Sequence, residues 1–150
     1  MEYLLRTNGL TKRYGHKNAV DHVNLHIRQG AIYGLIGRNG AGKTTILRMI
    51  AGLASPTEGE ISLFGETGKK ALYMTSRIGT LIEAPGLYPN MSAAENLKLK
   101  CLALGVRKKG YIDELLDAVG LSGVGRKRVR NFSLGMKQRL GIALALVGDP

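Results

Sequence analysis

The first part of the chain alternates apolar and polar residues. Between residues 3 and 28 this alternation is interrupted by turns near Gly9 and Gly15. A period of two is typical of strands, because successive side chains of a strand point to opposite faces. We therefore predict antiparallel β-strands joined by hairpin turns in this region.

Three further segments have the length and composition of strands. Residues 31–37, AIYGLIG, form a nearly continuous apolar run, which is typical of a strand buried on both faces of a parallel sheet. Residues 60–65 and 77–83 are rich in apolar side chains and bounded by turn residues. Each of these two segments predicts one more strand.

Four segments have helical periodicity, at residues 43–53, 92–104, 111–121 and 133–147. Ser92 and Glu95 occupy the positions of a capping box at the start of the second helix. Ser133 occupies the position of an N-cap at the start of the fourth. Strands and helices that alternate with short turns between them predict an α/β fold.

The segment GRNGAGKTT, residues 37–45, joins the apolar run to the first predicted helix. Its spacing, G-x-x-x-x-G-K-T, is that of a phosphate-binding loop, in which backbone N–H groups and a helix N-terminus surround a phosphate. The glycine spacing does not fit the dinucleotide fingerprint G-x-G-x-x-G. The residues expected to hold the nucleotide are Asn39, Gly40, Ala41, Gly42, Lys43, Thr44 and Thr45.

Three side chains of this loop have distinct expected roles. Lys43 would reach the β- and γ-phosphates as a mobile positive charge. The hydroxyl of Thr44 would ligate the Mg²⁺ that bridges these phosphates, and Thr45 would support the α-phosphate. The sequence therefore predicts a nucleotide and Mg²⁺ as ligands.

Composition and charge limit the number of domains, the compartment and the kind of partner that we expect. A length of 150 residues with 44% hydrophobic residues suits one compact domain, and no apolar stretch reaches the roughly 18 residues of a membrane span. The single cysteine, Cys101, and the lack of a secretory signal predict a cytosolic protein. We interpret the formal charge of +11, clustered at residues 107–109 and 125–130, as solvated faces and not as a nucleic-acid groove.

The phosphate-binding loop together with FSLGMKQRL, residues 132–140, resembles ATP-binding subunits of ABC transporters. The resemblance covers essentially all 150 residues and is strongest to the bacitracin-export and lantibiotic-immunity type. It implies ATP and Mg²⁺ as ligands and a P-loop nucleotide hydrolase core with an antiparallel β subdomain and a helical subdomain. The helical subdomain would lie at about residues 84–140, and residues 1–150 would form the N-terminal part of one nucleotide-binding domain.

The same resemblance assigns roles outside the loop. In this family an aromatic residue stacks on adenine and an apolar residue touches the same ring, and Tyr14 and Val20 occupy these places. The family signature LSGGQ falls on residues 132–136, from which Leu134 and Met136 depart. Ser133, Leu134 and Gly135 would contact ATP held by a facing subunit, which implies a head-to-tail dimer.

Glu83 stands where the family has a glutamine that touches Mg²⁺ and reports the nucleotide state to the membrane subunit. A carboxylate near a γ-phosphate is repelled unless a cation intervenes. We expect Glu83 to share the Mg²⁺ with Thr44 and to couple it to the permease; the alternative is an exposed acid at a strand end. The turn after Glu83 would line the groove that receives a permease helix, with Leu87 and Tyr88 as contacts.

Hydrolysis needs a metal-holding acid and a group that positions the attacking water. The family supplies them from a later strand that ends in Asp-Glu, the Walker B strand, and from a histidine beyond it, and neither is among residues 1–150. His16, His22 and His26 all precede the loop, and we interpret His22 and His26 as surface residues and not as metal ligands. We therefore expect a truncated subunit that binds ATP with little or no hydrolysis, with open apolar faces around residues 31–37.

Three functions stay open from the sequence. The first is the ATP-driven subunit of an exporter of a peptide antibiotic or related molecule, peripheral on the inner face of the cell membrane and docked on a separate permease. The second is a soluble ABC ATPase that acts on nucleic acid or ribosomes, although such proteins usually carry paired cassettes or long insertions. The third is a binding module without activity of its own. We expect the first, without a nucleic-acid partner.

Overall fold

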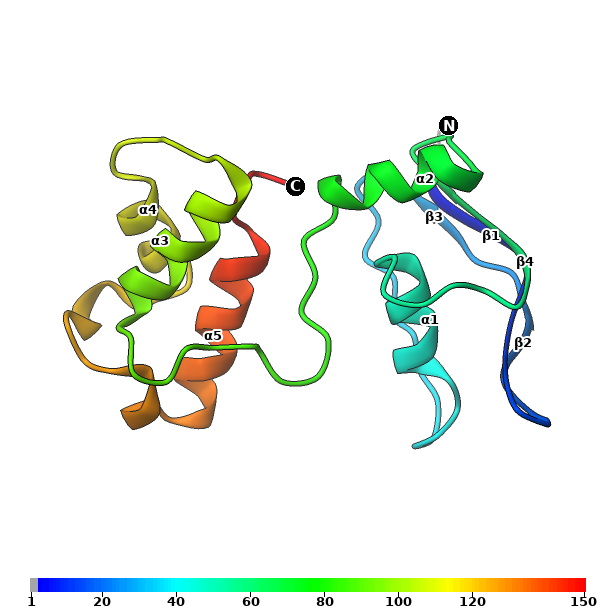
Figure 1. Ribbon diagram of the computed structural model, residues 1–150, viewed down its shortest axis with the longest axis horizontal. Coiled ribbons are helices and arrows are strands. Elements are labelled where there is room, and N and C mark those ends of the chain that lie inside the picture. The colour runs from blue at the N-terminus through cyan, green and yellow to red at the C-terminus, as the bar shows by residue number, and fades with distance from the viewer. Residues whose placement is uncertain (1–2) are drawn as a thin grey trace. The chain divides into compact units, whose positions relative to one another are not determined.

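The computed structural model describes residues 3–150, and the chain divides into two compact units (Figure 1). The first unit ends at Ser76 and the second runs from Arg77 to Pro150. The helical subdomain predicted at about residues 84–140 falls within the second unit. That residues 1–150 form part of one nucleotide-binding domain stays a prediction.

The first unit is built on an antiparallel sheet. Its strands are β1 (Tyr3–Tyr14), β2 (Lys17–Val23), β3 (His26–Arg28) and β4 (Glu58–Leu63). The long strand β1 pairs with β2 along its C-terminal part and with β3 along its N-terminal part, and β4 pairs with it as well. The antiparallel strands predicted for residues 3–28 and the strand predicted at 60–65 are thus confirmed, the latter shifted towards Glu58.

Two buried threonines hold β1 where its pairing changes from β3 to β2. The hydroxyl of Thr7 donates to Val23 O at 2.9 Å and accepts from Leu25 N at 2.8 Å. The hydroxyl of Thr11 donates to Gly9 O at 3.1 Å and accepts from His22 N at 3.0 Å. These bonds satisfy backbone groups that the irregular strand register leaves without a ladder partner.

Two predicted strands are absent from the described residues. Residues 31–37 take no regular structure, and Ile32 and Ile36 are almost fully exposed. In the segment 77–83, Arg77 ends a short 3₁₀ turn at Thr75–Arg77 and the remaining residues are irregular. An apolar run favours an extended backbone, but a strand exists only where a neighbour accepts its hydrogen bonds, and no described strand pairs with either segment.

All four predicted helices form, with shorter bounds in most cases. They are α1 (Lys43–Ile50), α3 (Ala93–Leu104), α4 (Tyr111–Ala118) and α5 (Leu134–Ala145). Helix α4 ends early because Gly120 takes a left-handed φ of 65° and Leu121 N bonds back to Leu116 O at 2.7 Å. Helix α2 (Gly68–Met74) was not predicted, and short 3₁₀ turns lie at Ser122–Val124 and Val129–Asn131.

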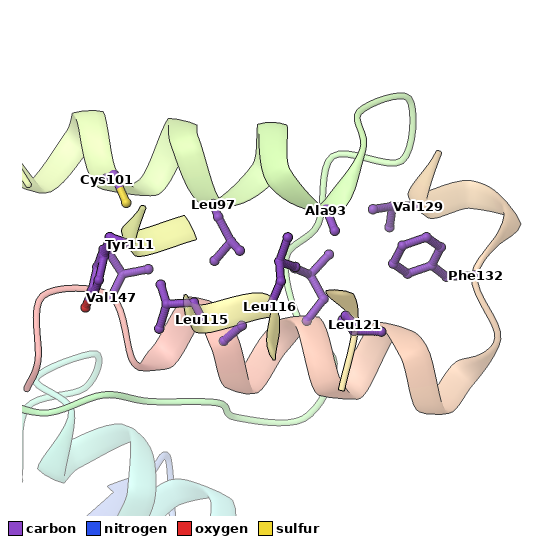
Figure 2. Packing of buried hydrophobic residues seen from close by; sticks show 12 residues of the cluster. Ala93, Leu97, Cys101, Tyr111, Leu115, Leu116, Leu121, Val129, Phe132 and Val147 are labelled. Carbon is purple, nitrogen blue, oxygen red and sulfur yellow. The ribbon is translucent and has the colours of Figure 1, made fainter. Parts of the chain in front are cut away.

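The core of the second unit lies between α3, α4 and α5, whose apolar side chains point toward one another (Figure 2). Leu97 and Leu140 are completely buried there, and Cys101 is buried as well. The first unit has its own smaller set of buried side chains, among them Leu10, Ile46 and Met49. No helix within residues 3–150 is long and apolar enough to cross a bilayer.

Candidate functional site

The phosphate-loop segment leads directly into α1. Gly40 and Gly42 have φ values of 82° and 87°, a region that side chains with a Cβ rarely enter. Ala41 N donates to Arg38 O at 3.1 Å, which closes the turn. Gly42 is the N-cap of α1 and makes no side-chain cap, so no side chain takes up the N–H groups of the first helical turn at this position. Such an arrangement of glycine turn and helix start suits an anion.

Gly42 is fixed by its contact with β2. A Cβ built on Gly42 would lie 2.3 Å from Ala19 O and 3.1 Å from Cγ2 of Val20. The loop therefore lies so close to the β1–β2 hairpin that only glycine fits at this position. This close approach explains the second glycine of the motif in steric terms.

The Lys43 ammonium lies over the loop. Its Nζ donates to Gly37 O at 2.6 Å and to Arg38 O at 2.9 Å. Both acceptors are backbone carbonyls of the loop itself. Thr44 and Thr45 follow in the first turn of α1 and are partly exposed.

Tyr14 and Val20, the two residues expected to contact adenine, differ in solvent exposure. Tyr14 is at the end of β1, is 54% exposed, and has Lys12 Nζ 5.2 Å from its ring centroid. Val20 is only 4% exposed and packs beneath Gly42. Val20 thus supports the loop, a role that the sequence did not reveal, and its contact with adenine stays a prediction.

The residues of the signature segment are at the start of α5 in the second unit. The Ser133 hydroxyl accepts from Met136 N at 3.2 Å, which confirms it as the N-cap of α5. Phe132 is buried in the helical core, whereas Leu134 is 75% exposed and a Cβ on Gly135 would meet open space. The exposed start of this helix leaves Leu134 and Gly135 accessible, and their contact with a nucleotide stays a prediction.

The turn that follows Glu83 borders a hollow of about 320 Å³ in the second unit. The residues that line it are Thr80, Leu81, Pro85, Gly86, Tyr88, Asn96, Leu99, Lys100, Ala103, Gly141 and Leu144. Gly141 allows α5 to lie close to this turn, because a Cβ at this position would be 2.8 Å from Pro85 Cβ. Of the two predicted contact residues, Tyr88 lines the hollow, whereas Leu87 packs against the helical core.

Asn96 positions the backbone of Tyr88 and was missed by sequence reasoning. Its Oδ1 accepts from Tyr88 N at 2.8 Å, and its Nδ2 donates to Tyr88 O at 3.2 Å and to Ser92 O at 2.8 Å. Asn96 is buried, yet all of these groups are satisfied. The available signal was a polar residue at the helical spacing of the buried Ala93 and Leu97.

The two expected Mg²⁺ ligands lie in different units. Thr44 belongs to the first unit, and Glu83, with a left-handed φ of 61°, belongs to the second. Within residues 3–150, no three His, Cys, Asp or Glu side chains lie close enough to hold a metal ion. A threonine hydroxyl beside a phosphate loop fits Mg²⁺, which takes few protein ligands and fills its octahedron with phosphate oxygens and water.

His22 lies on β2 and His26 on β3. His22 Nδ1 is 2.7 Å from Asp21 Oδ1, and the His26 ring packs edge-on against Tyr3 with centroids 5.5 Å apart. Both side chains are exposed. In the described part of the chain, neither histidine belongs to a group of three or more residues that could hold a metal ion.

Comparison with known proteins assigns the family. Residues 20–150 match the family described as ABC transporter. The chain is 50% identical to the bacitracin transport ATP-binding protein BcrA of Bacillus licheniformis, over 100% of this chain and 49% of that protein. It is 43% identical to the lantibiotic transport ATP-binding protein SrtF of Streptococcus pyogenes, over 98% of this chain and 63% of that protein. The chain thus spans about half the length of the first of these relatives.

Solved structures agree with the expected fold. One, an ATP-binding subunit of an ABC transporter, is 31% identical with a TM-score of 0.80, over 95% of this chain and 61% of that chain. Another, an ATP-binding cassette solved as a dimer in a post-hydrolysis state with ADP and Pi, is 26% identical with a TM-score of 0.81, over 97% of this chain and 70% of that chain. These likenesses confirm the P-loop α/β fold with its antiparallel and helical parts, and with the matched sequence they show that the chain belongs to the ABC transporter family.

Proposed function

We propose that this chain binds Mg-ATP at residues 37–45 and serves as the ATP-binding part of an exporter for a peptide antibiotic or a related molecule. The observation that carries the proposal is the loop geometry: two left-handed glycines, the close contact of Gly42 with Ala19 O, and an ammonium held over the loop. The printed functions of the two named relatives, bacitracin and lantibiotic transport, support the class of exported molecule.

Different residues of the chain would contact different parts of the nucleotide. Backbone N–H groups from Asn39 to Thr45 would surround the phosphates, and Lys43 would exchange its carbonyl partners for phosphate oxygens. Tyr14, exposed at the end of β1, would stack on the adenine, with Val20 as its neighbour below the loop.

Mg²⁺ would be held by the Thr44 hydroxyl, with Glu83 as the proposed second ligand. When bound, the ion supplies positive charge that neutralises the phosphate oxygens. Glu83 would then couple metal binding to the permease through the turn that borders the hollow. Its positive φ indicates a constrained backbone at this point.

The signature segment would act in a dimer. Ser133, Leu134 and Gly135 at the exposed start of α5 would contact ATP held by a second copy, which requires a head-to-tail arrangement. The dimeric cassette among the similar structures supports such an assembly. The protein would then act at the inner face of the cell membrane, through a separate permease subunit.

The relatives do not favour action on nucleic acid or ribosomes, because those named are transport proteins. We keep as a proposal that residues 1–150 bind ATP without hydrolysing it. The acid of the Walker B strand and the switch histidine that the family uses are not among these residues.

Calorimetric titration with Mg-ATP, combined with an assay of phosphate release, tests this function. Lys43→Ala should weaken binding tenfold or more, because a hydrogen bond from a charged group contributes about 1.5–3 kcal/mol. Lys70→Ala removes the same charge from α2, where Lys70 pairs with Glu66 at 3.7 Å, and should leave affinity unchanged. Equal loss in both variants would mean that net charge, and not the loop, attracts the nucleotide.

A further inference from the structure

Another hollow, of about 620 Å³, lies on the antiparallel sheet of the first unit, and we call it the sheet hollow. Strands β1, β3 and β4 contribute Arg6, His26 and Ser62 to its lining. Its other lining residues also come from the first unit, and not from the phosphate loop at 37–45. The sheet hollow is therefore separate from the site that we propose for ATP.

Arg6 is at the centre of a row of three polar side chains across the sheet. In the strand register, Arg6 is directly opposite His26 on β3 and directly opposite Ser62 on β4. Side chains that are directly opposite in an antiparallel pair have their Cβ atoms about 4.5–5.5 Å apart. One small ligand can therefore reach the guanidinium, the imidazole and the hydroxyl together.

This row carries positive charge and no carboxylate. Among residues 3–150, the Arg6 side chain forms no ion pair, and its Cζ lies 5.5 Å from the centroid of the Tyr3 ring. The His26 ring packs edge-on against the same tyrosine. An imidazolium directly opposite a guanidinium is repelled, so an anion bound between the two would stabilise both.

Further polar side chains line the sheet hollow beyond this row. Asn24 Oδ1 accepts from Gly9 N at 2.7 Å, which fixes the amide and leaves Nδ2 to donate to a ligand. Thr67 is the N-cap residue of α2, but its hydroxyl makes no cap hydrogen bond. Asn8 is directly opposite Glu60, in the row next to that of Arg6. These amides, the hydroxyl and the carboxylate offer the donors and acceptors that hydroxyl groups of a ligand need.

We propose that the sheet hollow binds a small phosphorylated ligand that also carries hydroxyl groups, such as a sugar phosphate. A guanidinium alone can satisfy both oxygens of a carboxylate, whereas donors on each side of Arg6 suit the additional oxygens of a phosphate. The volume is within the range of about 300–1,000 Å³ that is typical of small-molecule sites. The inference goes beyond the proposed function and does not rest on it, because the sheet hollow and the phosphate loop share no lining residue.

The test follows backbone amide NMR shifts of the 150-residue chain during titration with glucose 6-phosphate, inorganic phosphate or glucose. The residue-by-residue shifts distinguish binding at the sheet hollow from binding at the phosphate loop, and each spectrum shows whether a variant is folded. The variants are Arg6→Gln and Ser62→Ala. The control Arg13→Gln makes the same substitution on the same strand, where Arg13 is exposed and does not line the sheet hollow.

We expect saturable shift changes at residues 6–8, 24–26 and 60–62 that are largest with glucose 6-phosphate. Inorganic phosphate should bind several-fold more weakly, and glucose should cause no change at the same concentration. Arg6→Gln should weaken binding of glucose 6-phosphate about tenfold and Ser62→Ala about two- to fivefold, because each removes a donor to the phosphate. Arg13→Gln should stay within about twofold of the wild type.

Three results would overturn the inference. Equal losses in Arg6→Gln and Arg13→Gln would mean that net charge attracts the phosphate. Equal affinity for glucose 6-phosphate and inorganic phosphate would mean that the hydroxyl groups are not recognised. Changes confined to residues 39–45, or no saturable change at all, would show that the sheet hollow is not a binding site, and would leave the proposal for ATP to its own test with Lys43→Ala.

Discussion

Single residues decide whether the loop has its shape. Gly42 is confined by Ala19 O, and Lys43 is tied to Gly37 O and Arg38 O. These residues were identified from spacing alone, because their motif encodes a local backbone path. Asn96 and the burial of Val20 were not, because their roles depend on which distant backbone groups the fold brings to them.

Replacement of Gly42 by alanine should weaken the binding of Mg-ATP. The new Cβ would meet Ala19 O at 2.3 Å and sit at a φ of 87°, with a backbone strain of about 1–3 kcal/mol. Calorimetry should show at least tenfold weaker binding of Mg-ATP. Gly123→Ala meets open space and should bind as the wild type does; a similar loss in both would contradict the steric explanation.

Asn96→Leu should destabilise the second unit. It removes the partner of Tyr88 N, whereas Tyr88 O and Ser92 O keep the bonds that they accept from Met91 N and Asn96 N, and an unsatisfied buried polar group costs about 1–3 kcal/mol. Urea unfolding should show this loss, whereas Asn90→Ala in the exposed part of the turn should cost less than about 0.5 kcal/mol. A loss no larger than that of Asn90→Ala would show that Asn96 does not hold the turn.

At the scale of elements, helices were predicted better than strands. The capping box of Ser92 and Glu95 and the N-cap Ser133 are local signals, and α3 and α5 begin where these residues place them. Residues 31–37 and 77–83 were predicted as strands and are irregular. Helical hydrogen bonds close within one segment, while a strand needs a partner that its own sequence does not specify.

The capping box predicts a pH dependence for α3. Hydrogen bonds from the backbone and hydroxyl of Ser92 hold the pKa of Glu95 below its ordinary value. A lowered pKa means that the ionised carboxylate stabilises the folded state at neutral pH, and this stabilisation is lost as the pH falls through the lowered pKa. The free energy of unfolding of the wild type and of Glu95→Gln should therefore converge between neutral and acidic pH.

Urea unfolding at several pH values measures this convergence. Glutamine keeps the capping geometry but does not titrate, so it separates charge from shape. A difference between the two proteins that stays constant across the acidic range would show that the charge of Glu95 does not support the helix.

For the whole molecule, the sequence predicted the family, most of its secondary structure and a helical subdomain whose predicted range falls within the second compact unit. The side chains of Ile32 and Ile36 lie exposed in the first unit, next to the loop in sequence. Exposed apolar side chains this close in sequence to a binding loop are available to pack against another segment or partner. The formal charge of +11 adds a separate, non-specific attraction for polyphosphates that any binding experiment must distinguish from the loop.

The most direct test of nucleotide binding by this loop is a titration of the 150-residue chain with Mg-ATP, followed residue by residue through backbone amide NMR shifts. The loop geometry predicts that the largest changes fall on residues 39–45 and disappear in Lys43→Ala. Changes that are largest in the basic segment 126–130, with the loop unaffected, would contradict the proposal and indicate attraction by charge alone.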